Sequence, residues 1–261
     1  MTVWILGANG FIGKHLIEEL SGVCTVHKVS HTNDSWKRFP VPEFVINLAA
    51  SGPDATEKDS RSANIDFPTT VINHLRLTDH HFKWVQIASY FEYQCSMGRK
   101  DRYSIHKLEF RTWLASKCQE YDIELTSLVL PHVFGAGEKS NRLIPSAAYS
   151  FHNGIVLRSS AGEQFLPILN VYDACRAISC ALNSSQEICS AFPFWYGRVK
   201  ELLQIIQAQV GRGQFRLDPD WKSIDHAFPR IVFPEPVINW RPLRNIESLT
   251  SHQGDSHVTT S

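Results

Sequence analysis

Three glycines, each separated from the next by two residues, follow the first apolar segment of the chain, and they restrict its fold more than any other feature. The segment Gly7-Ala8-Asn9-Gly10-Phe11-Ile12-Gly13 comes directly after the apolar run Val3–Leu6 and leads into Phe11–Leu20, where apolar residues have helical spacing. A strand, a glycine turn and a helix in this order offer free backbone amides and the positive end of the helix to a pyrophosphate. The sequence therefore predicts a pyrophosphate-binding turn at Gly7, Gly10 and Gly13.

Apolar segments of strand length alternate with segments of helix length over the first half of the chain. The expected strands are Val3–Leu6, Thr25–Ser30, Phe44–Ala50, Lys83–Ser89 and Leu125–Leu130, and the expected helices include Phe67–Leu77 and Arg102–Tyr121. Such alternation is typical of a parallel sheet covered on both faces. We therefore expect an α/β fold with a Rossmann-type doubly wound parallel sheet. The thirteen residues between Ser30 and Phe44 include two prolines and scarcely accommodate a crossover helix and another strand.

The alternation of strands and helices ends at about residue 135, where short irregular runs with many aromatic residues and prolines begin. Two clear helices are expected beyond it, at Val171–Leu182 and Val199–Gln209. We expect a dinucleotide-binding domain over residues 1–135, a small C-terminal substrate-binding lobe over 136–250 and a disordered polar tail over 251–261. Some strands and helices of the lobe are expected to return to the sheet.

Composition excludes several classes of function. The chain has 26 Lys and Arg against 26 Asp and Glu in 261 residues, so its formal net charge is zero. Without a large positive field, it is poorly suited to nucleic acid or to an anionic membrane surface. The six cysteines show no Cys-x-x-Cys pair and no histidine at zinc spacing, so we expect reduced thiols and no metal site. The first residues leave no room for a signal segment, which predicts a cytoplasmic protein.

A second chemical feature lies in the segment Tyr103-Ser104-Ile105-His106-Lys107. Tyr103 and Lys107 are four residues apart, which places them on one face of a helix. The ammonium group favours the phenolate, and lowering a tyrosine pKa from about 10 to near 7 requires about 4 kcal/mol of differential interaction. A tyrosine of this kind can act as general acid and base on a carbonyl group.

Four segments in this order resemble the extended short-chain dehydrogenase/reductase family, the NAD-dependent epimerase/dehydratase type. They are the glycine turn, Val45-Ile46-Asn47-Leu48-Ala49-Ala50, Gln86-Ile87-Ala88-Ser89 and the segment with Tyr103 and Lys107. The resemblance continues through Leu130-Pro131-His132-Val133-Phe134-Gly135-Ala136-Gly137, through residues 162–173 and at Ile238-Asn239-Trp240-Arg241-Pro242. It spans residues 3–249.

The resemblance implies a catalytic set of Ser89, Tyr103 and Lys107. Ser89 would hydrogen-bond the substrate carbonyl, Tyr103 would transfer the proton, and Lys107 would hold the nicotinamide ribose and lower the pKa of Tyr103. Hydride would pass between the nicotinamide and a sugar carbon. The implied cofactor-binding residues are Gly7, Asn9, Gly10, Phe11, Ile12, Gly13, Ser30, His31, Leu48, Ala49, Ala50, Tyr103, Lys107, Pro131 and Val133, and the implied substrate-binding residues are Ser51, His132, Asn141 and Arg142.

Departures from the family pattern narrow the reaction. Dehydratases of the family have Asp-Glu directly after the catalytic hydroxyl residue, where this chain has Tyr90 and Phe91, so dehydration is disfavoured. Residues 162–173 most resemble nucleotide-sugar 4-ketoreductases of the abequose- and paratose-forming type. Where such relatives often have Arg and Asn, this chain has Leu166 and His132. The candidates for a replacement cation are Arg142, Lys139 and Arg216.

The end of the second expected strand bears on the choice of cofactor. NAD-preferring relatives commonly have an acidic residue there, whereas this chain has Val29-Ser30-His31-Thr32, with Lys37 and Arg38 shortly after. No carboxylate at that point would repel a 2′-phosphate. NADP(H) is therefore favoured over NAD(H), although Asp34 lies close enough in sequence to act against this preference.

Three functions stay open on the sequence. The first is NADPH-dependent reduction of a keto group on a nucleotide-linked deoxysugar; the second is an NAD-dependent nucleotide-sugar epimerase; the third is a non-catalytic regulator that senses NAD(P). The expected partner is a nucleotide-sugar substrate, with neither nucleic acid nor membrane. A homodimer is also open, because helices of this fold often pack into a four-helix interface, with Phe110 and Trp113 as candidate contacts. Burial against the chain's own sheet explains these two residues equally well.

Overall fold

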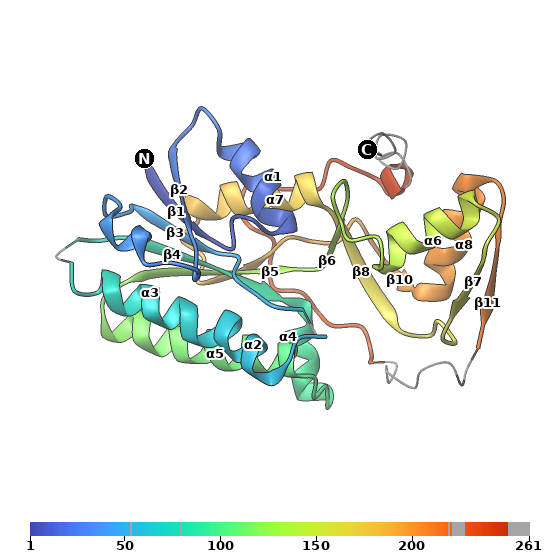
Figure 1. Cartoon of the computed structure of the whole chain (residues 1–261), viewed down its shortest axis with the longest axis horizontal. Coiled ribbons are helices and arrows are strands. Elements are labelled where there is room, and N and C mark those ends of the chain that lie inside the picture. The colour runs from blue at the N-terminus through green and yellow to red at the C-terminus, as the bar shows by residue number, and fades with distance from the viewer. Residues whose placement is uncertain (53, 79, 219, 221–227, 250–261) are drawn as a thin grey trace. The chain divides into compact units, whose positions relative to one another are not determined.

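The computed structural model describes residues 1–52, 54–78, 80–218, 220 and 228–249, and it divides the chain into two compact units (Figure 1). The first unit comprises Met1–Leu130, Ala174–Ala191 and Ile231–Arg241, and the second comprises Pro131–Asp173, Phe192–Arg230 and Pro242–Ser261. The chain therefore leaves the first unit after Leu130 and returns to it twice. The expected polar tail, residues 251–261, lies outside the described residues.

A parallel sheet, six-stranded over the described residues, forms the centre of the first unit. Its strands are β1 (Thr2–Leu6), β2 (Thr25–Val29), β3 (Phe44–Asn47), β4 (Lys83–Ser89), β5 (Glu124–Leu130) and β9 (Ile188–Ser190), in the spatial order β2-β1-β3-β4-β5-β9. All seven residues of β4 are buried, as expected for a strand covered on both faces. The predicted α/β doubly wound sheet is confirmed.

Helices cover both faces of this sheet. One face carries α1 (Phe11–Leu20) and α7 (Val171–Leu182), whose residues from Ala174 belong to this unit; the other carries α2 (Glu57–Arg61), α3 (Phe67–Leu75) and α5 (Arg102–Glu120) (Figure 1). A π-helical segment, Ser62–Asp66, joins α2 to α3, so this helical region begins at Glu57, before the predicted start at Phe67. The short α4 (Tyr90–Gln94) follows β4 directly.

A single 3₁₀ turn, Ser35–Arg38, connects β2 to β3. β3 pairs with β1 on the side opposite β2, so β2 is the edge strand of the sheet as described. The turn is anchored by Trp36, which is 2% exposed and packs edge to face on Trp4 with ring centroids 5.9 Å apart. The short interval between Ser30 and Phe44 thus contains no further strand, which agrees with the prediction from its length and prolines.

The second unit, over its described residues, contains two small sheets and two packed helices. β8 (Phe165–Asn170) lies between β6 (His132–Phe134), which is parallel to it, and β10 (Trp195–Arg198), which is antiparallel. β7 (Val156–Ser159) pairs in parallel with β11 (Gln214–Leu217). α6 (Leu143–His152) packs on α8 (Val199–Val210), and their buried side chains share one apolar cluster with Phe134 and Ile168. The sequence predicts α7 and α8, and its resemblance to the family over residues 162–173 implies a strand there, where β8 lies. It predicts neither α6 nor the other short strands.

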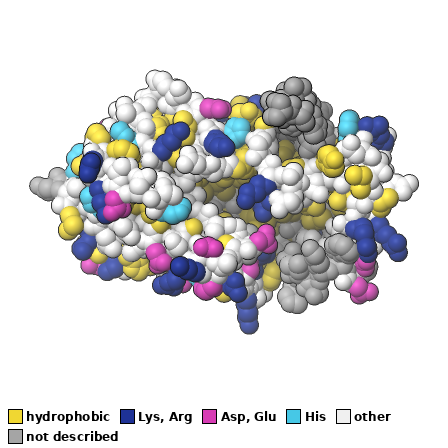
Figure 2. All heavy atoms as spheres, viewed as in Figure 1, with side chains coloured by type: hydrophobic (Ala, Val, Ile, Leu, Met, Phe, Trp, Pro, Cys, Tyr) yellow, Lys and Arg dark blue, Asp and Glu magenta, His cyan; other side chains and the backbone are white. Residues whose placement is uncertain are grey.

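The surface carries both signs of charge. On the face drawn in Figure 2, acidic and basic side chains are interspersed. No helix of the described part of the chain is both long and apolar enough to cross a membrane. Within the same residues, no cluster of His, Cys, Asp and Glu could hold a metal ion, and all six cysteines are free thiols.

Candidate active site

The glycine turn forms a narrow backbone cradle between β1 and α1. Gly7 has φ +77°, and a Cβ there would lie 2.8 Å from Leu48 O and Ala49 N. A Cβ on Gly13 would lie 2.5 Å from Gly7 O, so neither position has room for a side chain. Gly10 precedes α1 without a side-chain cap, which leaves the first amides of this ten-residue helix available to an anion. The cradle fits the pyrophosphate of a dinucleotide.

The end of β3 faces this cradle. Asn47 is buried; its amide nitrogen donates to Gln86 Oε1 at 2.9 Å, and its side-chain oxygen accepts from Ala49 N at 3.1 Å. Leu48 N donates to the main-chain oxygen of Leu6 at 2.9 Å. These bonds hold the predicted cofactor-binding residues Leu48 and Ala49 against Gly7.

We predict that Asn47→Ala lowers the free energy of unfolding by about 2 kcal/mol, because Ala49 N loses its acceptor and Gln86 Oε1 loses one donor inside the protein. Chemical denaturation measures the loss. The control is Asn153→Ala, which removes an exposed amide bonded to Tyr149 O at 2.8 Å. Equal losses in the two variants would contradict the structural role of Asn47.

The predicted ribose-binding residues Ser30 and His31 follow β2. Ser30 Oγ lies 3.0 Å from Thr32 Oγ1, and the His31 ring packs edge to face on Phe67 with centroids 5.8 Å apart. Asp34 lies in the same connection, and its Oδ2 forms an ion pair with Lys37 Nζ at 2.6 Å. The negative charge of Asp34, which would disfavour a 2′-phosphate nearby, is therefore neutralised by Lys37.

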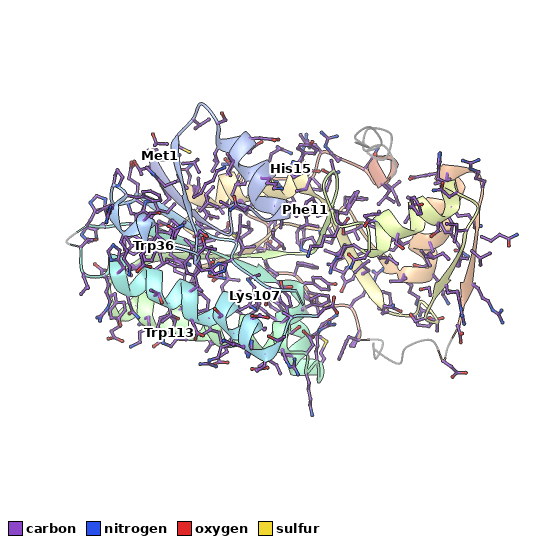
Figure 3. All side chains as sticks on the ribbon, viewed as in Figure 1. Met1, Phe11, His15, Trp36, Lys107 and Trp113 are labelled. Atoms are coloured by element: carbon purple, nitrogen blue, oxygen red, sulfur yellow. The ribbon has the colours of Figure 1, made fainter. Side chains whose placement is uncertain are left out.

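The structure brings Lys107 to the strand that ends in Ser89. Lys107 lies on the side of α5 that faces the sheet (Figure 3), is buried, and donates from Nζ to Ile87 O of β4 at 2.5 Å. Burial lowers the pKa of Lys107 below its usual value, Glu92 acts to raise this pKa, and Arg111 adds to the lowering. The site thus contains an ammonium group in surroundings that disfavour its charge.

Tyr103 lies on α5 one turn before Lys107 and is half-buried. Its ring contacts Phe91 edge to face, with centroids 6.3 Å apart. Phe91 is the second residue of α4, and Ser89 caps that helix by accepting from Phe91 N at 3.3 Å. The three predicted catalytic residues therefore lie near the carboxyl end of β4, the end at which open α/β sheets bind their ligands.

Two charged residues near these three were missed by the sequence analysis: the buried Glu92 and the partly buried Arg111. Glu92 Oε1 accepts from Ser89 N at 2.8 Å, and Glu92 Oε2 lies 2.6 Å from Arg111 Nε. A signal for Glu92 exists in the sequence, because Ser89-Tyr90-Phe91-Glu92 matches the capping-box pattern, and the structure contains that box. Arg111 follows Lys107 by one helical turn, a spacing that also could have drawn attention to it.

A hydrogen-bonded chain of side chains connects α5 with the loop after β3. His106 Nε2 lies 3.1 Å from Glu57 Oε1, and His106 Nδ1 lies 2.9 Å from Ser60 Oγ. The amide of Asn64 donates to Ser60 O at 2.8 Å and to Ser51 Oγ at 3.2 Å. Ser51, a predicted substrate-binding residue, is thereby tied to the helix that carries Tyr103 and Lys107.

The other predicted contacts with cofactor and substrate belong to the second unit. Pro131 precedes β6, and His132 and Val133 lie on it. His132 Nε2 is 3.5 Å from Glu138 Oε1, and Arg142 Nε is 3.8 Å from the same oxygen. Asn141 is exposed. Glu138 therefore joins two of the predicted substrate-binding residues, and it was absent from the sequence prediction.

Leu166 lies on β8 and packs against the apolar cluster of the second unit. Of the candidate replacement cations, Lys139 and Arg216 are exposed, and Arg142 lies near Glu138. The strand next to Leu166 also presents Arg198, whose guanidinium lies 5.5 Å from the ring centre of Phe165. Arg198 is a further cation in this region that the sequence analysis did not select.

Phe110 and Trp113 both pack against the apolar cluster of the first unit, and Phe110 is 1% exposed. Their own sheet therefore accounts for these two residues. The homodimer stays a prediction without support from them.

The comparisons with known proteins identify a family and two relatives. A model of the NAD dependent epimerase/dehydratase family matches residues 3–190. The CDP-abequose synthase of Yersinia pseudotuberculosis is 26% identical over 210 residues, which are 71% of this chain and 73% of that protein. The CDP-abequose synthase of Salmonella typhimurium is 28% identical over 224 residues, 75% of this chain and 74% of that protein.

Solved structures of low sequence identity share the fold. RMD from Pseudomonas aeruginosa, solved in complex with NADPH, has a TM-score of 0.81 at 18% identity, over 96% of this chain and 97% of that chain. The UDP-N-acetylglucosamine 4-epimerase from Methanobrevibacter ruminantium M1 has a TM-score of 0.78 at 18% identity, over 95% of this chain and 96% of that chain.

Proposed function

The chain belongs to the NAD dependent epimerase/dehydratase family, and on that premise we propose that it uses NADPH to reduce a keto group on a nucleotide-linked deoxysugar. Membership makes it an NAD(P)-dependent enzyme of the extended short-chain dehydrogenase/reductase type, as its sequence motifs predict. One observation carries the proposal: Tyr103 and Lys107 share a face of α5, and Lys107 is bonded to the strand that ends in Ser89.

The first unit supplies residues for both ends of the cofactor. The cradle at Gly7, Gly10 and Gly13 would hold the pyrophosphate with backbone amides. One N–H of the Lys107 ammonium group donates to Ile87 O, and the others would hold the nicotinamide ribose. When bound, the cofactor supplies the hydride, and the protein supplies position and electrostatics.

Proton transfer falls to Tyr103. Its hydroxyl would donate a proton to the carbonyl oxygen as hydride reaches the carbonyl carbon, which yields an alcohol and a tyrosine phenolate. Ser89 would donate a hydrogen bond to the same oxygen and so position it. Lys107 would stabilise the phenolate, because its positive charge lies one helical turn away.

Two features of the chain favour reduction of a deoxysugar ketone. The positions after Ser89 hold Tyr90 and Phe91, which provide no acid and base pair for loss of water. Similarity to the two CDP-abequose synthases over about three quarters of the chain supports a nucleotide-linked deoxysugar as the substrate class. The retention of both Tyr103 and Lys107 supports catalysis over mere sensing of NAD(P).

The test is a panel of CDP- and TDP-linked 4-keto-6-deoxyhexoses with NADPH, followed by loss of absorbance at 340 nm and by mass spectrometry of the product. We expect NADPH to be consumed and the sugar to gain two hydrogens. Protein that purifies with tightly bound NAD and interconverts 4-epimers without net consumption of NADPH would establish the epimerase instead.

The preference for NADPH has its own test at the end of β2. His31→Asp places a carboxylate where the 2′-phosphate is expected, so we predict that the Kd for NADPH rises about 10- to 100-fold while that for NADH rises much less. Isothermal titration calorimetry measures both constants. His27→Asp is the matched control, because it adds the same charge within β2. Tighter binding of NADH than NADPH by the unsubstituted protein would contradict the preference.

A further inference from the structure

A partly buried ion pair, between Glu92 and Arg111, lies near the Ser89 end of β4 and outside the predicted catalytic set. The side chain of Glu92 has no exposed surface, that of Arg111 is 19% exposed, and Oε2 and Nε are 2.6 Å apart. Desolvation cancels much of the attraction in such a pair, so apolar residues of similar size often serve stability as well. Stability alone is therefore a weak reason for the pair.

The pair connects both halves of the predicted site. Glu92 Oε1 accepts from Ser89 N at 2.8 Å, which fixes the first turn of α4 on the end of β4. Arg111 lies one turn after Lys107 and two turns after Tyr103, so these three residues share one face of α5. The carboxylate thus links the strand end that carries Ser89 to the helix that carries the other two residues.

We propose that Glu92 and Arg111 are positioning residues that hold Ser89 in register with Tyr103 and Lys107 and balance the charge around the site. This inference rests on the proposed function, because it assigns the pair to the same reaction. The two residues of the pair have opposite electrostatic effects on Lys107. Glu92 raises the pKa of Lys107 and Arg111 lowers it, while burial, the largest influence, also lowers it.

Other ionisable groups lie on α4 or close to it. Tyr93 on α4 has its ring centre 5.7 Å from the guanidinium of Arg111, and burial raises its pKa. Burial also raises the pKa of the Cys95 thiol. Arg99 and Asp101 form an ion pair with each other before α5. All four are unchanged in the variants below, so a shift in pH dependence reports the substituted charge.

Single substitutions of Glu92 and of Arg111 should shift the pH dependence of kcat in opposite directions. Glu92→Gln removes a negative charge but keeps an acceptor for Ser89 N, so Lys107 and Tyr103 lose their protons at lower pH. The alkaline limb of kcat for ketone reduction should move down by roughly one pH unit. Arg111→Met removes a positive charge and should move the limb up by a similar amount. The double variant should return the limb to its original place with a lower kcat.

Arg111→Lys separates position from charge. It keeps the positive charge but loses the planar donor geometry, so we expect kcat to fall about tenfold with little change in KM or in the alkaline limb. The matched control for Glu92→Gln is Glu120→Gln, at the end of α5. It removes the same negative charge from an exposed pair, in which Lys117 Nζ lies 2.5 Å from Glu120 Oε2, and should leave the pH profile unchanged.

The outcomes separate this inference from the proposed function. If the unsubstituted protein reduces the ketone and Tyr103→Phe abolishes the reaction, but Glu92→Gln and Arg111→Met move the limb in the same direction or leave it in place, the positioning role is wrong. If no ketone is reduced by the unsubstituted protein, the proposed function is wrong. If Arg111→Met does not fold, Glu92→Gln and the double variant still test the inference. Only a charge effect predicts that the alkaline limb moves in Glu92→Gln and returns to its original place in the double variant.

Discussion

Replacing Tyr103 with Phe is expected to lower kcat for reduction of a nucleotide-linked keto sugar by about 10³-fold. The substitution removes the proton donor and keeps the ring that packs on Phe91, so folding should be preserved. The Kd for NADPH should change by about threefold or less, because Tyr103 is only one of the implied cofactor contacts and the cradle at Gly7–Gly13 and Lys107 are untouched. Single-turnover kinetics, with cofactor and substrate near saturation, measures the chemical step directly.

The control for Tyr103→Phe is Tyr93→Phe. Tyr93 lies on the neighbouring helix α4 and is partly buried, so the same hydroxyl is lost close to the site without loss of the proposed proton donor. Its kcat should stay within about threefold of the unsubstituted value. Equal loss in the two variants, or unchanged turnover in Tyr103→Phe, would remove Tyr103 from the mechanism.

Gly13→Ala is expected to have the largest effect on the fold and on cofactor binding. In an exposed helix, replacing Gly by Ala stabilises by about 1 kcal/mol. At Gly13 the sign reverses, because the new Cβ would lie 2.5 Å from Gly7 O and 2.7 Å from Ala8 O, and both are backbone atoms. We expect unfolding to require about 2–4 kcal/mol less free energy and the Kd for NADPH to rise at least 100-fold.

Gly52→Ala provides the comparison. A Cβ at Gly52 would meet no atom within 4 Å, so neither the free energy of unfolding nor the Kd for NADPH should change appreciably. Denaturant titrations with and without NADPH give both quantities. Gly13→Ala with the stability and affinity of the unsubstituted protein would mean that α1 does not pack against β1 as closely as the structure has it.

The strands and helices that could be predicted from the sequence are those that form because of a local pattern of apolar and polar residues. The largely apolar run Lys83–Ser89 forms a fully buried strand, and the helix that carries Tyr103 and Lys107 begins at Arg102, as predicted. The predicted strand Phe44–Ala50 was too long. β3 ends at Asn47, whose side-chain oxygen accepts a hydrogen bond from Ala49 N.

The elements and side-chain pairs that could not be predicted depend on contacts between residues far apart in the chain. The helix from Leu143 contains Pro145 and is followed by strands of only four residues at Val156–Ser159 and Gln214–Leu217, whose pairing no local pattern specifies. Glu92 fits a capping box and Arg111 follows Lys107 by one helical turn, but neither pattern shows that these two side chains pair with each other. Their pairing becomes visible only after the fold has brought α5 beside α4.

The most direct test of the proposed reaction follows the hydride itself. The protein is incubated with a nucleotide-linked 4-keto-6-deoxyhexose and NADPH that carries deuterium at both C4 positions of the nicotinamide, and the product is analysed by mass spectrometry and NMR. We predict one deuterium on the carbon that bears the new hydroxyl and one NADP⁺ formed per product, with both lost in Tyr103→Phe. A product that forms without deuterium and without net consumption of NADPH would contradict the assignment of this chain as a ketoreductase.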